Sequence, residues 1–261
     1  MLSPLRHRTL FLQFTRREIA ERHRGSFIGF AWAIINPLMM LLIYSFVFIG
    51  VFRMKWPGAE NVTGPAYALR LFCGLVVFNL FAEVLSRAAS LISSQPNLVK
   101  KVQFPLELLS FVSVASALFH FAVALGILLA FSFVFERLSW SVLYVPLILL
   151  PLPLLMLGLS LMLSAVGVYV RDTAQIMTLI VNFTLFLSPV FYTTMHLTGG
   201  IKRFIQFNPL AGVIENLRCS LFADASLDWG SWSYSLGVSA AVCVLGACVF
   251  VVLRDGFSDV L

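Results

Sequence analysis

The chain has 261 residues, of which 60 % are hydrophobic and only 11 % are charged, and its net charge is +6. Soluble domains usually carry roughly 25 % charged residues, so this composition excludes an ordinary water-facing surface. The 18 lysines and arginines do not gather in one polar module, as a nucleic-acid-binding domain requires, but lie near the start and around apolar stretches. We therefore predict an all-α integral membrane protein with no nucleic-acid partner, whose basic residues set topology and contact membrane lipids.

Six transmembrane helices are predicted from the stretches that lack charge, because about 20 apolar residues cross a hydrocarbon core of about 30 Å. Five of them are clear, at residues 32–52, 108–135, 138–170, 173–201 and 229–253. The whole chain, 1–261, is then a single transmembrane domain whose six-helix part covers residues 32–253.

The second helix is less clear, because charged residues leave only residues 71–82 as its apolar centre. Arg70 and Arg87 are separated by about 25 Å of helix, so both side chains can point outward to opposite membrane interfaces. Glu83 lies four residues before Arg87 on the same helix face, and we expect the two to form an ion pair. Such a pair is more typical of a structural role than of a functional one.

Lysine and arginine counts orient the chain, because cytoplasmic segments carry an excess of both residues. Six helices place both termini on one side, and a cytoplasmic amino terminus gives eleven basic residues inside and seven outside. We expect a multi-pass protein of the cytoplasmic membrane with both termini in the cytoplasm. Residues 254–261 are then a short cytoplasmic tail.

Residues 1–31 are predicted to form an amphipathic helix that lies in the inner interface instead of crossing the membrane. Its apolar side can face lipid and holds Leu10, Phe11, Phe14 and Ile19. Its charged side can face water and holds Arg16, Arg17, Glu18 and Arg22. A solvated basic tail is the simpler alternative.

Residues 193–228 form an unusually long connection before the last span, and Gly199-Gly200 and Asn208-Pro209 divide it into short apolar segments. Irregular segments can enter a membrane where protein or water satisfies their backbone. We predict a pair of short re-entrant helices on the outer side. On physical grounds an ordinary external loop fits equally well.

The sequence contains no pattern that marks a catalytic, metal or nucleotide site. A phosphate-binding GxxxxGK[ST] loop, an HExxH motif and a GxSxG motif are all absent from it. We therefore predict no catalytic residue, no metal and no cofactor bound by this chain. Two other classes stay open: an ion-gradient-driven carrier that uses Glu83 and His120, and a membrane enzyme that uses Glu215, Asp224 or Asp228.

Four stretches, in this order and spacing, resemble one family, the membrane subunits of type-2 ABC exporters for polysaccharides. They are residues 22–37 (RHRGSFIGFAW, then Asn36-Pro37), residues 97–105 (NLVKKVQFP), Arg171-Asp172, and a carboxyl-terminal set. That set is 187–192 (LSPVFY), Asn208-Pro209-Leu210 and 215–218 (ENLR). His23 and Ile28 stand where the family usually has an aromatic residue and leucine. O-antigen and teichoic-acid export subunits are the most similar members.

The resemblance implies a homodimer that associates with two copies of a separate P-loop ATPase, which would hold ATP and Mg²⁺. It implies a permease that moves a polysaccharide carried on a polyprenyl-pyrophosphate lipid, either an O-antigen or a wall or capsular glycan. A permease for a small hydrophobic compound, as in drug exporters of the wider family, is the alternative.

Residues 94–105 are predicted to be the cytoplasmic coupling helix that contacts the ATPase, with Arg171 and Asp172 as a second contact. Asn97 can cap this helix, and the other candidates in it are Leu98, Lys100, Lys101 and Phe104. Topology-setting lysines without a partner, and an ordinary turn at Arg171-Asp172, are the simpler interpretations.

Four arginines near the inner interface are candidates for binding the pyrophosphate, namely Arg16, Arg17, Arg22 and Arg24, because guanidinium groups bind phosphate oxygens in a bidentate manner. Anchoring to anionic lipids explains the same cluster. Aromatic faces suit sliding sugar rings, and the candidates for the glycan path are Tyr44, Phe186, Phe191 and Tyr192. Packing against lipid accounts for most other aromatic residues.

Overall fold

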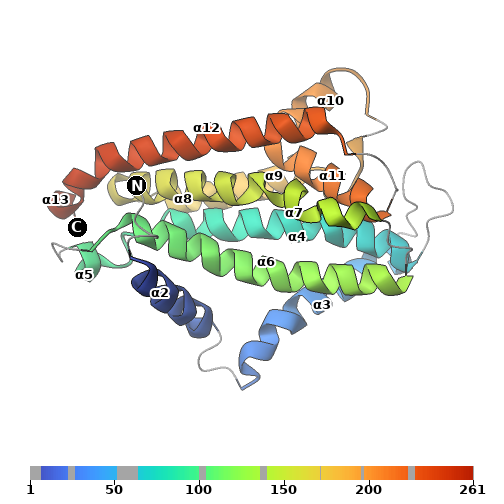
Figure 1. The fold of residues 1–261 in the computed structure, drawn as a ribbon, viewed down its shortest axis with the longest axis horizontal. Coiled ribbons are helices and arrows are strands. Elements are labelled where there is room, and N and C mark those ends of the chain that lie inside the picture. The colour runs from blue at the N-terminus through green and yellow to red at the C-terminus, as the bar shows by residue number, and fades with distance from the viewer. Residues whose placement is uncertain are drawn as a thin grey trace.

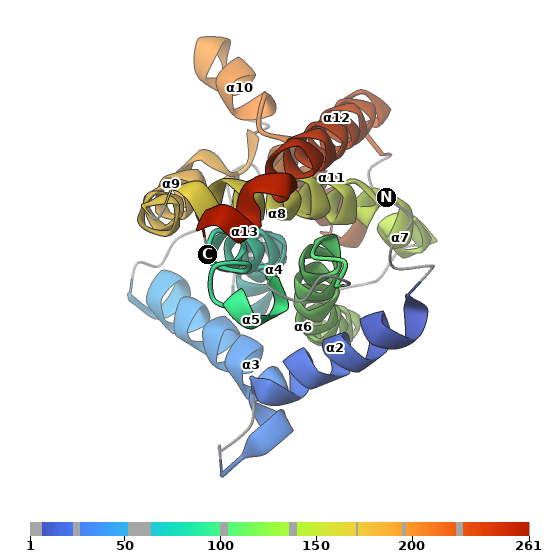
Figure 2. The same cartoon turned by 90° about the vertical axis from the view of Figure 1, so that its left-hand side faces the viewer.

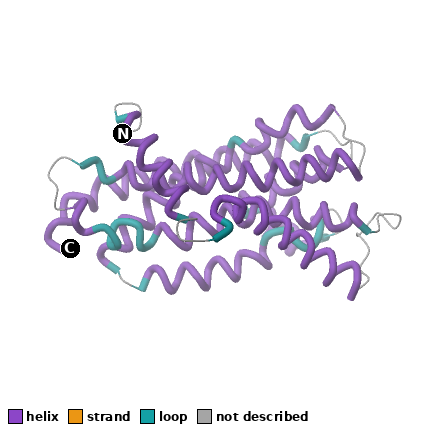
Figure 3. The backbone as a smooth tube through the Cα atoms, turned by 90° about the horizontal axis from the view of Figure 1, so that it is seen from below, coloured by secondary structure: helices purple, strands orange, loops and turns teal. Residues whose placement is uncertain are grey.

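The computed structural model describes residues 7–22, 27–51, 64–99, 104–135, 140–170, 172–194, 197–222 and 227–260. Every regular element in these ranges is helical, and most helices run along one common direction (Figures 1 and 3). Together with the apolar composition, this confirms an all-α integral membrane protein.

The long helices follow the predicted order of spans. The elements are α2 (Arg8–Glu21), η1 (Gly29–Ala31), α3 (Trp32–Ser45), the π-helical η2 (Phe46–Val51), α4 (Pro65–Ala88), α5 (Pro96–Val99), α6 (Glu107–Phe135), η3 (Trp140–Tyr144), α7 (Val145–Leu149), α8 (Pro151–Tyr169), α9 (Thr173–Leu187), α10 (Gly199–Gln206), α11 (Pro209–Phe222), α12 (Trp229–Leu253), η5 (Arg254–Gly256) and α13 (Phe257–Val260). The elements α5 and α13 lie at one end of the bundle, and α10 and α11 lie at the other (Figure 1). We call these the α5 end and the α10 end.

Five helical segments in the described residues are long and apolar enough to cross a membrane: Gly29–Val51, Pro65–Ala88, Glu107–Phe135, Trp140–Tyr169 and Trp229–Gly256. The prediction of a fifth span over residues 173–201 is wrong at its end, because α9 stops at Leu187 after 15 residues. Pro189 drives the preceding Ser188 into an extended conformation, with ψ of 144°. At about 22 Å, α9 is shorter than a hydrocarbon core of about 30 Å.

The most charged of the spans, α4, occupies the centre of the bundle. Figure 2, which looks along the helices, shows α4 surrounded by α3, α6, α8 and α9. The prediction that Arg70 points outward is wrong: its side chain is buried, donates hydrogen bonds to the carbonyls of Ala66 and Phe222, and lies over the Phe222 ring. Protein carbonyls replace water around this cation, as is required of a charge at membrane depth.

The amino-terminal helix α2 packs its half-buried apolar side against the bundle, and its predicted position in the inner interface stays a prediction. It lies against α6, and the Phe14 ring contacts that of Phe104 at a centroid distance of 5.5 Å. Glu18 and Arg22, predicted to face water, lie on the same half-buried side. Arg16 and Arg17 are exposed, as expected.

Residues 254–260 are folded against the bundle instead of extending as a tail. Phe257 is buried and its ring contacts those of Phe250 and Tyr169. The Tyr169 hydroxyl donates to the Leu253 carbonyl at 2.7 Å. These contacts fix the α5 end of α8 and α12.

The connection before the last span contains two short helices, α10 and α11, as predicted. Asn208 lies between the two helices, and its side-chain oxygen accepts a hydrogen bond from the Leu210 amide at 3.0 Å where α11 begins at Pro209. The helix α11 is largely buried against α4, α7 and α12. How deeply either helix enters a membrane remains a prediction.

Glycine residues let α8 and α12 approach backbone to backbone. A methyl group at Gly246 would overlap the Gly158 carbonyl, and one at Gly158 would lie 2.5 Å from the Val242 carbonyl oxygen. Small residues at such crossings are typical of helix pairs in membranes, where close packing supplies the association energy.

Gly246→Val is expected to destabilise the fold, because the added side chain meets rigid backbone, and overpacking typically costs about 1–3 kcal/mol. The measurement is the thermal midpoint of the purified protein in detergent, read by size-exclusion chromatography. Gly237→Val is the matched control, since nothing lies within 4 Å of a methyl group at that position of the same helix. Equal midpoints for both variants would contradict the close approach of α8 and α12.

Candidate functional site

Two ion pairs connect α2 to the central helix α4. Glu18 pairs with Arg87 at 2.8 Å, and Arg22 pairs with Glu83. The predicted pair of Glu83 with Arg87 is therefore wrong, because α2, packed against α6, brings a side chain of opposite charge to each of these α4 residues. Nδ1 of His120 on α6 lies 2.8 Å from the Ser116 carbonyl oxygen and 3.3 Å from the Arg22 guanidinium.

Burial raises the pKa of Glu18 above its ordinary value, and Arg87 and Arg22 only partly oppose this effect. Its ion pair with Arg87 therefore does not recover the full cost of removing the carboxylate from water. The docked position of α2 is thus sensitive to protonation of Glu18.

A cleft of about 760 Å³ opens between α3, α4 and α6 beside these ion pairs. Its walls are mostly apolar, and Arg22, Glu83, His120, Asn36 and Asn79 supply its polar lining. Of the predicted headgroup ligands, only Arg22 lines this cleft. Arg17 pairs with Glu21 on the exposed side of α2, Arg16 is exposed, and Arg24 lies outside the described residues.

The predicted coupling element lies at the α5 end, in the connection between α4 and α6. Asn97 is exposed, but it lies inside α5 instead of preceding it, so the prediction that it caps this helix is wrong. Leu98 and Phe104 pack against a buried cluster that includes Ile92, Leu109 and Phe250, so they anchor the element. Asp172 is exposed just before α9, and Lys100, Lys101 and Arg171 lie outside the described residues.

Three of the predicted glycan-path residues belong to one aromatic cluster between α3 and the end of α9. Phe191 lies 6.2 Å from Tyr44 and 6.5 Å from Phe186 between ring centroids. Phe48 completes the cluster at 5.6 Å from Phe191. The fourth residue, Tyr192, donates from its hydroxyl to the Phe186 carbonyl at 3.1 Å. Phe186 is largely exposed, so the cluster has an open side.

A buried arginine, Arg218 of α11, holds the α10 end together. Its Nε donates to the Arg70 carbonyl at 3.2 Å, and its two terminal nitrogens donate to the carbonyls of Tyr192 and Val190 at 3.2 and 3.1 Å. Gly74 makes room for this group, because a methyl group there would lie 2.9 Å from Arg218 Nη2. One side chain thus joins α11, α4 and the segment after α9.

Glu215 and Asn208 complete this arrangement, which we call the Arg218 hub. Glu215 Oε1 lies 3.5 Å from Arg218 and accepts from the Thr194 amide at 2.8 Å. The Asn208 amide donates to the Ser188 hydroxyl at 2.9 Å. The carboxyl-terminal motif stretches 187–192, 208–210 and 215–218 therefore converge in space.

Comparison with known proteins identifies the family. A sequence profile described as ABC-2 type transporter matches residues 9–222, from α2 to the end of α11. The chain belongs to the ABC-2 type transporter family.

Several relatives of the chain match it along almost its whole length. Two Klebsiella pneumoniae proteins named "O-antigen export system permease protein RfbA" are each 25 % identical over 255 residues, which cover 97 % of this chain and 95 % of each relative. A Myxococcus xanthus protein of the same name is 25 % identical over 256 residues, with the same coverage. This ABC-2 family chain thus spans nearly the full length of these permeases.

The sequence-based list of site residues for this ABC-2 family chain omitted several residues that the structure brings into the same places. Phe48 lies one helical turn after Tyr44, so helical spacing was sufficient to include it. Arg218 stood in the quoted motif but received no role, and Glu215, three residues before it on the same helix face, was considered only for the membrane-enzyme alternative. The partners of Arg22 and Arg87 depend on how α2 docks, which no local pattern specifies.

Docking of α2 is expected to strengthen as the pH falls. Because the pKa of Glu18 is raised in the docked state, protonation of Glu18 favours docking. The docking free energy gained from this protonation is complete below the ordinary pKa of 4.5 and is lost as the pH rises through the raised pKa. Hydrogen exchange of the α2 amides, corrected for the chemical exchange rate, measures this from pH 8 to 5. In Glu18→Gln the pH dependence should flatten; an unchanged slope would assign it to another group, such as His120.

Arg218→Met is expected to destabilise the protein by roughly 3–5 kcal/mol, because it leaves Glu215 and three carbonyls without their buried partner. Arg218→Lys should recover only part of the lost stability, since one ammonium group cannot reproduce the hydrogen-bonding geometry of the planar guanidinium group. Thermal midpoints in detergent test both variants. Arg203→Lys on the exposed surface of α10 is the control, and a loss no larger than in that variant would refute the hub.

Proposed function

We propose that the chain is the permease subunit of an ATP-driven exporter that moves a lipid-linked polysaccharide across the bacterial cytoplasmic membrane. The similarity along 97 % of the chain to proteins named O-antigen export permeases carries this proposal. Membership of the ABC-2 type transporter family supports the same conclusion. The substrate class is a glycan on a polyprenyl-pyrophosphate lipid, such as an O-antigen.

Energy enters, in this proposal, from a separate ATPase subunit that binds ATP and Mg²⁺ and docks at the α5 end. The position of α5 supports it: this short helix stands between the ends of α4 and α6, and Leu98 and Phe104 anchor it to the bundle. A rigid anchored element can pass a displacement to both helices. Asn97 and Asp172 are exposed at this end, and Lys100, Lys101 and Arg171 neighbour them in sequence.

The α5 end is cytoplasmic and the α10 end is external in this assignment, so both termini lie in the cytoplasm. Two copies of the chain would associate with two ATPase subunits. The largely exposed apolar side chains of α3 and α9, among them Leu42, Leu179 and Phe183, support a contact between copies. The glycan would then pass beside the aromatic cluster of Tyr44, Phe48, Phe186 and Phe191.

The lipid-linked pyrophosphate would approach through the exposed arginines of α2 and the cleft that Arg22 lines. Arg16 and Arg17 present cations to the interface, where phosphate oxygens favour guanidinium partners. The apolar walls of the cleft suit a polyprenyl chain.

The competing functional classes have weaker support from the side chains that they require. A gradient-driven carrier needs a titratable relay, but Glu83 is engaged by Arg22. A membrane enzyme needs a carboxylate poised for chemistry, but Glu215 accepts from the Thr194 amide, and Asp228 caps α12 through the Gly230 and Ser231 amides. Asp224 lies outside the described residues.

Purification of the tagged chain from its native membrane is expected to recover a P-loop ATPase in equal amount. In Lys100→Glu/Lys101→Glu the partner should be lost while the chain remains inserted and folded, because the variant reverses the charge of the proposed docking element. The measurement is the ratio of the two subunits after affinity purification.

The matched control for this test is Arg8→Glu/Arg254→Glu, which makes the same charge change at two exposed positions outside the docking element. This variant should retain the ATPase. Equal recovery of the ATPase with both double variants would contradict the assignment of residues 94–105 as the coupling element. ATP-independent transport by the chain alone, reconstituted in sealed vesicles, would overturn the proposed function as a whole.

A further inference from the structure

A polar crevice at the α10 end has no role in the description above. Three adjoining hollows of about 490, 440 and 250 Å³ lie against α10. Gln206 lines all three hollows, and Asp228 and Ser231 line two of them. We call this continuous region the α10 crevice. Each hollow is many times larger than the roughly 30 Å³ that one water molecule occupies, so the crevice has room for a ligand.

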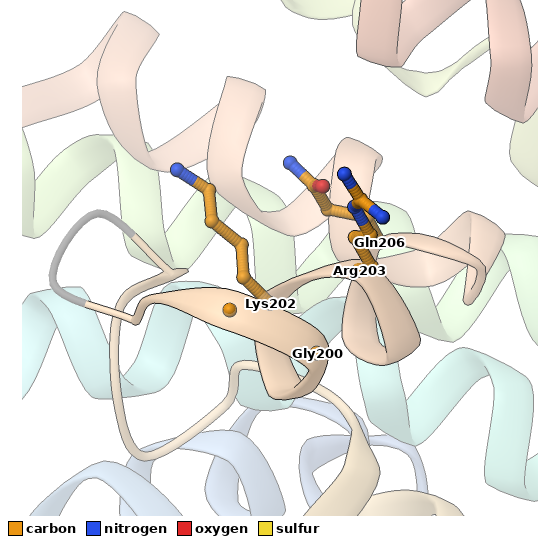
Figure 4. A pocket seen from close by; sticks show the side chains of 5 residues that line it. Gly200, Lys202, Arg203 and Gln206 are labelled. Atoms are coloured by element: carbon orange, nitrogen blue, oxygen red, sulfur yellow. The ribbon is translucent and has the colours of Figure 1, made fainter.

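One wall of the α10 crevice consists of side chains without protein partners. Lys202, Arg203 and Gln206 project from the same side of α10 (Figure 4). No described residue forms an ion pair or hydrogen bond with the Lys202 ammonium or the Gln206 amide. Lys202 is nevertheless half-buried, so its charge is held at the crevice.

The opposite wall is fixed by its own hydrogen bonds. Asp228 Oδ1 accepts from the Gly230 and Ser231 amides at the start of α12, and the Asp228 amide donates to Asn216 Oδ1 at 2.9 Å. Glu215 is held by the Arg218 hub. These groups are preorganised, so ligand binding does not lose conformational entropy by ordering them.

The charges of the α10 crevice favour a polyhydroxylated ligand over an anion. Two cations, Lys202 and Arg203, share the crevice with two carboxylates, Glu215 and Asp228, so its lining offers both signs of charge and both hydrogen-bond donors and acceptors. A hydroxyl group both donates and accepts, so it pairs equally well with ammonium, amide and carboxylate groups. Phe207 and Tyr234 line the 440 Å³ hollow and are 68 % and 40 % exposed, which offers apolar faces beside the polar groups.

We infer that the α10 crevice binds sugar residues of the exported polysaccharide at the outer end of its path. The inference rests on the proposed function, because the glycan reaches this end only if the chain exports it. Lys202, Gln206 and Asp228 hydrogen-bond sugar hydroxyls, and Tyr234 and Phe207 pack against the C–H faces of the rings. The site holds the emerging glycan on the external side, away from the exposed apolar residues Ile201 and Phe204.

The test measures binding of the polysaccharide to the purified permease–ATPase complex in detergent, without nucleotide. The probe is the polysaccharide of the native cells, freed from its lipid by mild acid. Trp229, 56 % exposed, is the nearest tryptophan in sequence to the lining residues Asp228 and Gly230, although it does not line the crevice itself, and serves as the reporter. We expect a saturable change in tryptophan fluorescence that Trp229→Phe removes.

Lys202→Ala/Gln206→Ala should weaken binding about tenfold, as expected for the loss of two hydrogen bonds. Asp228→Asn should weaken it less, and it retains the cap of α12 because asparagine caps helices as well as aspartate does. Gln175→Ala and Arg254→Ala, both exposed and outside the crevice, are the matched controls and should bind as the wild type. Wild-type affinity in the double variant would overturn the inference.

Two further outcomes separate this inference from its alternatives. A fluorescence change with dioctanoyl phosphatidylglycerol, but none with the polysaccharide, would assign the crevice to lipid headgroups and overturn it. If the complex exports glycan in membrane vesicles while the double variant binds normally, only the sugar site fails. If no ATPase co-purifies and no export occurs, the proposed function fails, and the inference fails with it.

Discussion

The fold depends on the burial of one cation, the Arg218 guanidinium, which is 4 % exposed. Burying an unpaired charge at this depth would cost too much free energy for the fold to be stable. Three carbonyls and one carboxylate therefore surround the guanidinium and pair with it. Those acceptors belong to α4, α11 and the segment after α9. The requirement to satisfy one side chain therefore fixes how α11 lies, which face α4 turns toward it, and where the segment after Pro189 runs.

The same reasoning explains why the helix with most charges lies in the middle. Arg70, Glu83 and Arg87 of α4 each find protein partners, in α11 for the first and in α2 for the other two. In lipid none of them would be satisfied, whereas α3 and α12 carry no charged residue and can lie at the periphery. Charge, usually a sign of exposure in soluble proteins, is here a sign of burial within the bundle.

Sequence reasoning identified what depends on local composition and missed what depends on docking. The apolar runs predicted α6, α12 and the segment of α3 and η2 together nearly to the residue, and Asn208-Pro209 correctly separated α10 from α11. The end of α9 was missed because the run of uncharged residues continues past Pro189, although the proline itself marked the break. The predicted outward position of Arg70 and the predicted Glu83–Arg87 pair were wrong because α2 and α11 supply partners to these residues, and only the tertiary structure brings those partners close.

The two ends of the bundle differ in what holds them, and this difference suits a device that is driven at one end and gated at the other. The α5 end is fixed mainly by the non-directional apolar packing of Leu98, Phe104 and Phe257, with the Tyr169–Leu253 hydrogen bond beside it. The α10 end is fixed by the directional hydrogen bonds of Arg218, which either hold or break. The helix α4 joins the two ends and packs against α3, α6, α8, α9 and α11. A push at α5 would therefore reach the Arg218 hub through a single continuous helix of 24 residues.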